Sequence, residues 1–365
     1  MSALQVIWFL LIGVLLTGYA ILDGFDLGVG FWHLFARKDE DRRALLNAIA
    51  PVWDGNEVWL LTGGGAIFAA FPHVYATVFS GLYLALMLVL FGLIFRAVSV
   101  EFRGKDTSAR WRSLWDTGFA LGSTIPALLF GVAVGNILRG LPLDEKMNFT
   151  GSFFGLLNPY ALLIGLLGLA MFATHGALYI AVKTEKEVED RARGWALKAW
   201  GAYLALFILA CIVTIVTQPQ LLRNTSALPI LWAIPVAALA AIVMVGIFLG
   251  GGAVFFADRP ASRPALRPAV RPADRRKRSV MKAFLACGVS IACLMALVGA
   301  GIFPNLVPAS NDPALSLTIA NASSSPLTLW VMFIIALVGM PIVIAYTIWV
   351  YAIFRGKVKV EAEGY

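Results

Sequence analysis

Two short acidic motifs lie inside long apolar segments of this sequence. Asp23 and Asp26 belong to GYAILDGFDLGVG, and Asp54 and Glu57 belong to APVWDGNEVW. In each motif the carboxylates are three residues apart, which places them on roughly one face of a helix. An ionisable side chain at membrane depth is expensive and marks a functional site by default. Because burial and like-charged neighbours favour the protonated form of a carboxyl group, the four residues are candidates for a proton route.

The same carboxylates also have a structural interpretation. They could cap helix starts, or form ion pairs with Arg37, Lys38 or Arg96. For a fifth acid, Asp116, the position at the start of an expected span favours a partner of the helix dipole. The surrounding glycines allow helices to approach closely and shield a carboxylate from lipid; they are Gly24, Gly28, Gly30 and Gly55.

The elements that must position these residues are membrane spans. The chain has 365 residues, of which 60% are hydrophobic and 14% are charged, a balance that a water-exposed globular surface does not have. A transmembrane helix needs about 20 apolar residues. The sequence therefore predicts an all-α polytopic protein with a single membrane domain over 1–365. Nine spans are expected, at about 5–34, 49–71, 73–101, 113–140, 158–183, 193–217, 228–257, 280–303 and 327–355.

Loop charge decides the number of spans and their direction. Alternate loops hold 23 Lys and Arg residues on one side and two, Lys146 and Arg223, on the other. Cytoplasmic loops are enriched in Lys and Arg, so the N-terminus is expected outside and the C-terminus in the cytoplasm. Merging the second and third spans at Pro72 would leave eight spans and put two basic loops, 35–48 and 102–112, on opposite sides. With nine spans, all four motif carboxylates lie toward the cytoplasm.

The net charge of +8 comes mostly from those cytoplasmic loops. It indicates contact with anionic lipid headgroups and disfavours a nucleic-acid partner. One basic cytoplasmic loop, at 258–279, contains a repeated Arg-Pro-Ala unit that cannot propagate a helix.

Other chemistry is not indicated by the sequence. His33, His73 and His175 fall at separate places along the expected spans, so no pair suggests a heme or metal site. Cys211, Cys287 and Cys293 have no CxxC spacing and are interpreted as packing residues. There is no phosphate-binding loop, dinucleotide fingerprint, zinc-protease motif or serine-hydrolase elbow.

The motifs together resemble one known family. The two acidic motifs, followed by RWRSLWDTGFALGS, GVAVGN, LLNPYALL, THGALY and PILWAIP in that order, are similar to subunit II of cytochrome bd-type quinol oxidase over nearly the whole chain. The Arg-Pro-Ala repeat and a short sixth loop depart from the pattern. The resemblance implies a fold of two four-helix bundles plus one peripheral helix.

The resemblance also implies a function and partners. Such a complex is a terminal oxidase of the respiratory chain in the bacterial cell (inner) membrane: it oxidises quinol and reduces dioxygen to water, taking protons from the cytoplasm. The expected partner is subunit I, which carries two b-type hemes and one d-type heme, or a third b-type heme in its place. Subunit II has no heme ligands of its own. Small single-helix subunits, lipids and a structural quinone occur in some members, and no residue here identifies a quinone site.

Residue roles follow from the same resemblance. Asp54 matches a carboxylate implicated in a proton route to the hemes, and Trp59 matches a position on a proposed oxygen access path. Asp23 and Asp26 match the family's paired acids. The alternative, from the residues alone, is a stand-alone proton-coupled transporter that uses the same acids. The absence of a clear inverted repeat disfavours it.

Overall fold

The computed structural model describes residues 1–250 and 272–358, and for 272–278 it describes the backbone alone. Most of the basic loop predicted at 258–279 lies outside the described residues. In chain order the helices are α1 (Ala3–His33), α2 (Asp39–Ile49), α3 (Trp53–Ala70), α4 (Pro72–Gly81), α5 (Tyr83–Phe102), α6 (Ala109–Arg139), α7 (Phe153–Leu156), α8 (Pro159–Lys183), α9 (Lys186–Thr217), α10 (Arg223–Ala227), α11 (Ala233–Leu249), α12 (Pro272–Ile302) and α13 (Pro326–Ile353). Two short strands, β1 (Asn305–Val307) and β2 (Leu317–Thr318), pair antiparallel.

Eight of the described helices are long and apolar enough to cross a membrane. They are α1, α5, α6, α8, α9, α11 with the turn before it, α12 and α13. The helix α3 is not among them, and it is the one that contains Asp54 and Glu57. The chain is therefore a multi-pass membrane protein, while a ninth span through α3 and the direction of insertion stay predictions.

The helical conformation is interrupted twice after α3, whereas the sequence predicts a single turn there. Phe71 leaves the helical conformation, with φ −135° and ψ 66°, because a residue that precedes proline avoids the α region. Pro72 then occupies the first turn of α4, where its missing N–H is not needed. A second break at Leu82 separates α4 from α5. The predicted run 73–101 is thus two helices.

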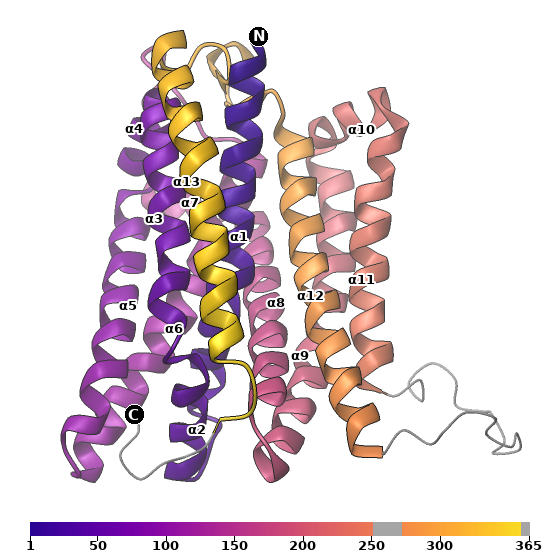
Figure 1. Ribbon diagram of the computed structural model, residues 1–365. Helices are drawn as coiled ribbons and strands as arrows, with labels where there is room; N and C mark the ends of the chain where they lie inside the picture. Colours follow the sequence, from indigo (N-terminus) through magenta and orange to yellow (C-terminus); the bar gives the residue numbers. More distant parts are fainter. Residues whose placement is uncertain (251–271, 359–365) are drawn as a thin grey trace, which may run out of the picture.

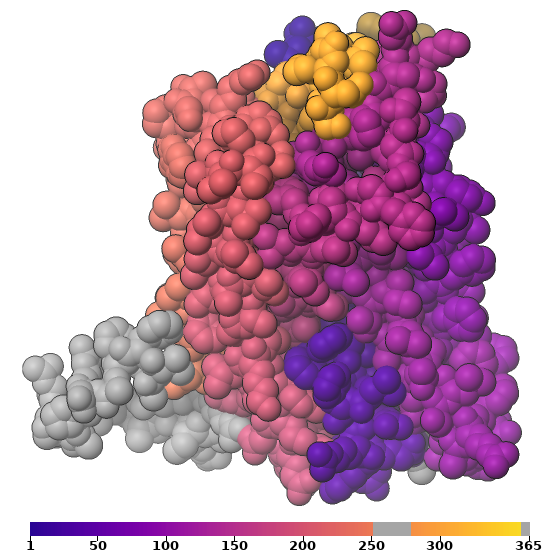
Figure 2. Space-filling view, turned by 180° about the vertical axis from the view of Figure 1, so that it is seen from behind, coloured from indigo at the N-terminus to yellow at the C-terminus, as the bar shows by residue number. Residues whose placement is uncertain are grey.

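The long helices run side by side in two groups (Figure 1). In one group α1 packs against α3 and α6, and α5 packs on α6; in the other, α8, α9, α11 and α12 pack in sequence. Contacts of α8 with α1 and α6 join the groups. α13 lies in front of α1 and α3, largely exposed, with Leu329 its only buried side chain among the described residues. Seen from behind, α2 lies on the surface at the lower end (Figure 2).

Backbone contact between α1 and α8 holds the two groups together. A Cβ atom added to Gly28 would lie 1.9 Å from the backbone oxygen of Phe172, and one added to Gly176 would lie 2.3 Å from the carbonyl carbon of Gly28. Gly30 packs closely on the side chain of Ser123 in α6. The prediction that glycines near the first motif permit close helix approach is confirmed for Gly28 and Gly30. It is wrong for Gly55, which has open space around it.

Replacing Gly28 by Ala should therefore destabilise the protein. We expect a loss of about 3 kcal/mol, the upper end for overpacking, because backbone atoms cannot move aside as a flexible side chain can. The measurement is the thermal unfolding midpoint of the purified protein in detergent. Gly201→Ala in α9 is the matched control, since no described atom lies within 4 Å of the added Cβ. Equal midpoints for the two variants would show that the crossing is not tight.

Candidate functional site: a buried acidic cluster

The first acidic motif surrounds a buried arginine. Asp23 on α1 and Arg96 on α5 are both fully buried. The two guanidinium nitrogens of Arg96 donate to the two carboxylate oxygens of Asp23, one of them at 2.9 Å. This two-point pairing is the strong geometry for an arginine and a carboxylate. Of the three cations that the sequence offered as partners, Arg96 is therefore the one that pairs with Asp23, whereas Lys38 pairs with Glu187 at the surface.

The second motif reaches the same arginine from α3. An oxygen of Glu57 lies 3.5 Å from Nη2 of Arg96, close enough for charge attraction but without a well-formed hydrogen bond, since that buried oxygen has no hydrogen-bond partner among the described residues. Three helices, α1, α3 and α5, therefore converge on one guanidinium. Two carboxylates, from Asp23 and Glu57, share its charge.

Asp26 lies one helical turn beyond Asp23 and is also fully buried. Its Oδ2 accepts a hydrogen bond of 2.7 Å from the side-chain amide of Asn56, while its Oδ1 is buried without a partner in the described part of the chain. A buried carboxylate with one unmatched oxygen has room to accept a proton without breaking an existing bond. We refer to Asp23, Asp26, Asn56, Glu57 and Arg96 as the acidic cluster.

Asp54 and Trp59 lie at the edge of the acidic cluster. Asp54 is exposed in the first turn of α3, one turn before Glu57. The indole of Trp59 covers Gly18 of α1, where an added Cβ would meet the ring at 2.3 Å. The structure thus brings Asp23, Asp26 and Glu57 together in the interior and leaves Asp54 at the surface of this chain.

A second charged network lies where α1 ends and α6 begins. Asp116 accepts from Nε2 of His33 at 2.5 Å, from Nε of Arg103 at 2.5 Å and from Nη1 of Arg42 at 2.8 Å. The prediction that Asp116 serves the helix dipole is wrong, because the residue lies two turns inside α6 and is buried. Its ion pairs connect α6 to the end of α1, to α2 and to the segment after α5.

The other histidines and the cysteines are the remaining candidate ligands, and they differ in burial. The ring of His175 stacks on Phe284 with centroids 4.5 Å apart, and its Nε2 bonds the carbonyl of Ile21. His73 is exposed on α4. Cys287 is fully buried, and Cys211 and Cys293 are half-buried; all three are free thiols. Among the described residues no group of three or more His, Cys, Asp or Glu could hold a metal ion.

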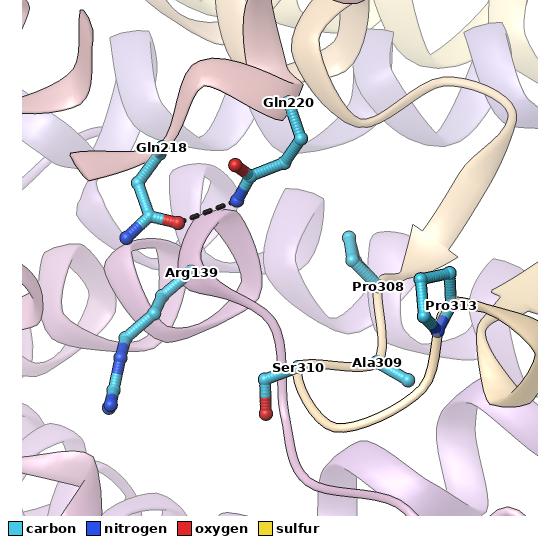
Figure 3. Close-up of a pocket in the computed structure, with 7 residues that line it drawn as sticks. All are labelled: Arg139, Gln218, Gln220, Pro308, Ala309, Ser310 and Pro313. Carbon is cyan, nitrogen blue, oxygen red and sulfur yellow. Dashed lines mark hydrogen bonds between the residues drawn. The ribbon is translucent and has the colours of Figure 1, made fainter. Parts of the chain in front are cut away.

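A hollow of about 470 Å³ opens at the other end of the molecule, where α6 and α9 finish. Arg139, Gln218 and Gln220 line it together with the loop at 308–313, and Nε2 of Gln220 donates to Oε1 of Gln218 at 2.7 Å (Figure 3). It has no carboxylate in its lining. The hollow is therefore separate from the acidic cluster in place and in chemistry.

One family model matches almost the whole chain. Residues 4–354 match the family model described as cytochrome bd terminal oxidase subunit II. The chain belongs to the cytochrome bd terminal oxidase subunit II family. It is therefore a subunit of an oxidoreductase complex, and the resemblance seen in its motifs is confirmed.

Curated relatives from several bacteria support the assignment to the subunit II family. The chain is 38% identical to cytochrome bd-I ubiquinol oxidase subunit 2 of Escherichia coli K12, with 99% of this chain and 96% of the relative covered. It is 36% identical to cytochrome bd ubiquinol oxidase subunit 2 of Bacillus subtilis 168, with 98% of each covered. The fold is similar to a chain in the structure of bd oxidase from Geobacillus thermodenitrificans, with a TM-score of 0.72 at 17% identity, covering 97% and 99% of the two chains.

A cytochrome complex contains heme, so the histidines of this subunit II chain are the first residues to test for heme binding. The Nε2 atoms of His33 and His175 are taken by Asp116 and Ile21, and His175 is stacked face to face on an aromatic ring. A porphyrin needs an open face beside its ligand, which neither buried histidine offers. His33 and His175 therefore do not fit heme.

The pair of Arg96 and Asp23 should dominate the stability of this part of subunit II. Arg96→Met is expected to destabilise the protein by about 3–5 kcal/mol, because it leaves Asp23 buried without its counter-charge. Adding Asp23→Leu should restore part of the loss, and the thermal unfolding midpoints of the wild type, the two single variants and the double variant complete the cycle. Simple additivity of the two losses would contradict a direct pair.

Proposed function

We propose that this chain is the heme-free subunit of a membrane-bound quinol oxidase and that its acidic cluster conducts protons toward oxygen reduction in the partner subunit. The observation that supports this proton role is a series of carboxylates that extends from the surface of the chain to its interior. Asp54 is exposed, Glu57 is partly buried one turn further along α3, and Asp23 and Asp26 are fully buried behind it. Reduction of dioxygen to water consumes protons, which such a series can deliver.

The surface around Asp54 indicates where the partner lies. Asp54 shares one face of α3 with Val58, Leu61 and Phe68, whose exposed fractions are 46%, 73% and 60%. The spacing of four, seven and fourteen residues keeps them on a single stripe. A carboxylate that faces hydrocarbon is costly, so a protein surface on this stripe is favoured over lipid. We assign the stripe to the heme-bearing subunit I.

The complex as a whole follows from the family and from loop charge. Subunit I is expected to hold two b-type hemes and a d-type or third b-type heme, and small single-helix subunits, lipids and a structural quinone would complete the assembly. The relatives' names point to ubiquinol as one substrate for this family. The basic loops support insertion into the bacterial inner membrane with the N-terminus outside, and the path of α3 alongside α1 in Figure 1 supports nine spans.

Trp59 has a separate proposed role. The resemblance of the WDGNEVW motif supports a position on an oxygen access path, and the Trp59 ring covers Gly18 of α1, the helix that bears Asp23 and Asp26. The competing function, a proton-coupled transporter acting alone, draws no support from the relatives, which are oxidase subunits. Co-purification separates the two: a lone chain without a heme-bearing partner would favour transport.

Removing the charge of Asp54 should stop turnover without disturbing assembly. The Asp54→Asn complex is expected to keep its heme absorbance and to lose most of its quinol oxidase activity, about tenfold or more, since general acid and base groups contribute on the order of 100-fold or more. Glu145→Gln is the control, because Glu145 is an exposed acid in a loop far along the chain. Normal oxygen uptake by Asp54→Asn would exclude the proton role, and loss of heme with activity would indicate a scaffold residue instead.

A further prediction tests whether the α3 stripe contacts subunit I. Leu61→Trp enlarges a residue in the middle of the stripe and should reduce the amount of heme-bearing subunit that co-purifies with this chain. Ile335→Trp on α13 is the matched control, because Ile335 is similarly exposed, at 65%, on another helix. If both variants co-purify with a full complement of heme, the assignment of the α3 stripe fails.

A further inference from the structure

The last helix reaches into the acidic cluster through one hydroxyl group. Tyr351, in the final turn of α13, donates a hydrogen bond of 2.9 Å to Oδ1 of Asn56. The amide nitrogen of the same Asn56 side chain donates to Asp26 at 2.7 Å and to the carbonyl of Leu22 at 3.2 Å. Tyr351 and Asp26 are therefore linked through a single planar amide.

The amide of Asn56 has two orientations that differ in what they present to Asp26. In the observed one the donor nitrogen faces the carboxylate and the acceptor oxygen faces Tyr351. A flip would turn an acceptor oxygen toward Asp26 and would lose the bond to Leu22. The carbonyl of Leu22 and the carboxylate of Asp26 can only accept, so they keep the amide nitrogen on their side. The hydroxyl of Tyr351 donates to the amide oxygen and so fixes the position and plane of the Asn56 amide beside Asp26.

The end of α13 is held in place although little else of the helix is buried. Nζ of Lys357 donates to the carbonyls of Ala181 and Thr184 and lies 3.2 Å from Oε2 of Glu189. The backbone N–H of Val358 donates to the carbonyl of Lys183 at 2.7 Å. These bonds attach the tail after α13 to the end of α8 and the start of α9. They anchor the segment that follows Tyr351 in the chain.

We propose that Tyr351 is a positioning residue for the proton route: its hydroxyl orients Asn56 so that the amide donates to Asp26 and sets how readily that carboxyl group takes up and releases a proton. The inference rests on the proposed proton function of the acidic cluster. The hydroxyl acts through Asn56, and an amide between the two groups makes the link an orienting contact, not a proton path.

Other ionisable groups also face Asp26, and all of them stay unchanged when Tyr351 is altered. On α1 Asp23 is one turn away, Glu57 approaches from α3 and Arg96 from α5. On α8, the hydroxyl group of Tyr179 interacts electrostatically with Asp26. The ring of His175, also on α8, contacts Phe25, the residue before Asp26. The charge set around the carboxyl group is thus the same in the wild type and in a Tyr351→Phe variant.

The test measures oxygen uptake with quinol as a function of pH in the assembled, heme-containing complex. Tyr351→Phe removes only the oxygen atom. The Asn56 amide stabilises the ionised form of Asp26 by donating a hydrogen bond to it. Weakening that hydrogen bond should move the midpoint of the pH profile to higher pH by about half a unit, which corresponds to part of the free energy of one hydrogen bond. Tyr346→Phe is the control, because Tyr346 is an exposed tyrosine on the same helix, and it should leave the profile unchanged. Lys357→Met should shift the midpoint in the same direction by less.

Combined substitutions test whether Tyr351 acts on Asp26 through Asn56. Asn56→Ala should shift the profile further than Tyr351→Phe, and adding Tyr351→Phe to Asn56→Ala should change nothing more, because the intermediary is gone. An equal shift in both backgrounds, an unchanged profile in Tyr351→Phe, or loss of heme from that variant would each overturn the proposal. Failure of the proton function itself has a different signature, namely that Asp26→Asn retains full turnover.

Discussion

The charge of Arg96 is the constraint on which the rest of the acidic cluster depends. It is fully buried, and a buried guanidinium without a counter-charge would be costly. Its pairing with Asp23 joins α5 to α1, and its attraction for Glu57 brings in α3. Asp23 is occupied by this pair, whereas the donor to Asp26 among the described residues is the neutral side-chain amide of Asn56. Asp23 therefore has a direct counter-charge, and Asp26 has a neutral hydrogen-bond partner in its place.

The backbone crossing of α1 and α8 determines where this charge lies. Gly28 and Gly176 allow the two helices to touch, and the second half of α1, which bears both aspartates, is buried as a result. The network around Asp116 then closes the same end of the molecule through His33, Arg42 and Arg103. The acids are thus enclosed by helix contacts on one side and by ion pairs at the end. On the α3 side, the cluster leads to the exposed carboxylate of Asp54.

Under the proposed function, this subunit would affect the chemistry of its partner by supplying protons. The geometry of this chain fits that role better than heme binding, because its buried histidines are occupied by packing and hydrogen bonds. It also places the surface acid, Asp54, on the most exposed apolar stripe of α3, where contact with another subunit would cover it. In the proposed function, assembly and proton delivery use the same face of α3.

The sequence by itself determined the class of protein, the family and the residues at which chemistry is concentrated. Apolar runs require a bilayer, and acids inside such runs stand out because burying them is expensive. Only the tertiary structure decided which acid is paired and which is not, since Asp23 and Asp26 have equivalent settings in the motif and differ only in what α3 and α5 bring to them. Asn56 does not stand out in the sequence because it is neutral, although a polar amide within an apolar run is itself a signal. Tyr351 carried no signal at all, because it is separated from Asn56 by most of the chain and meets it only when α13 packs on α3.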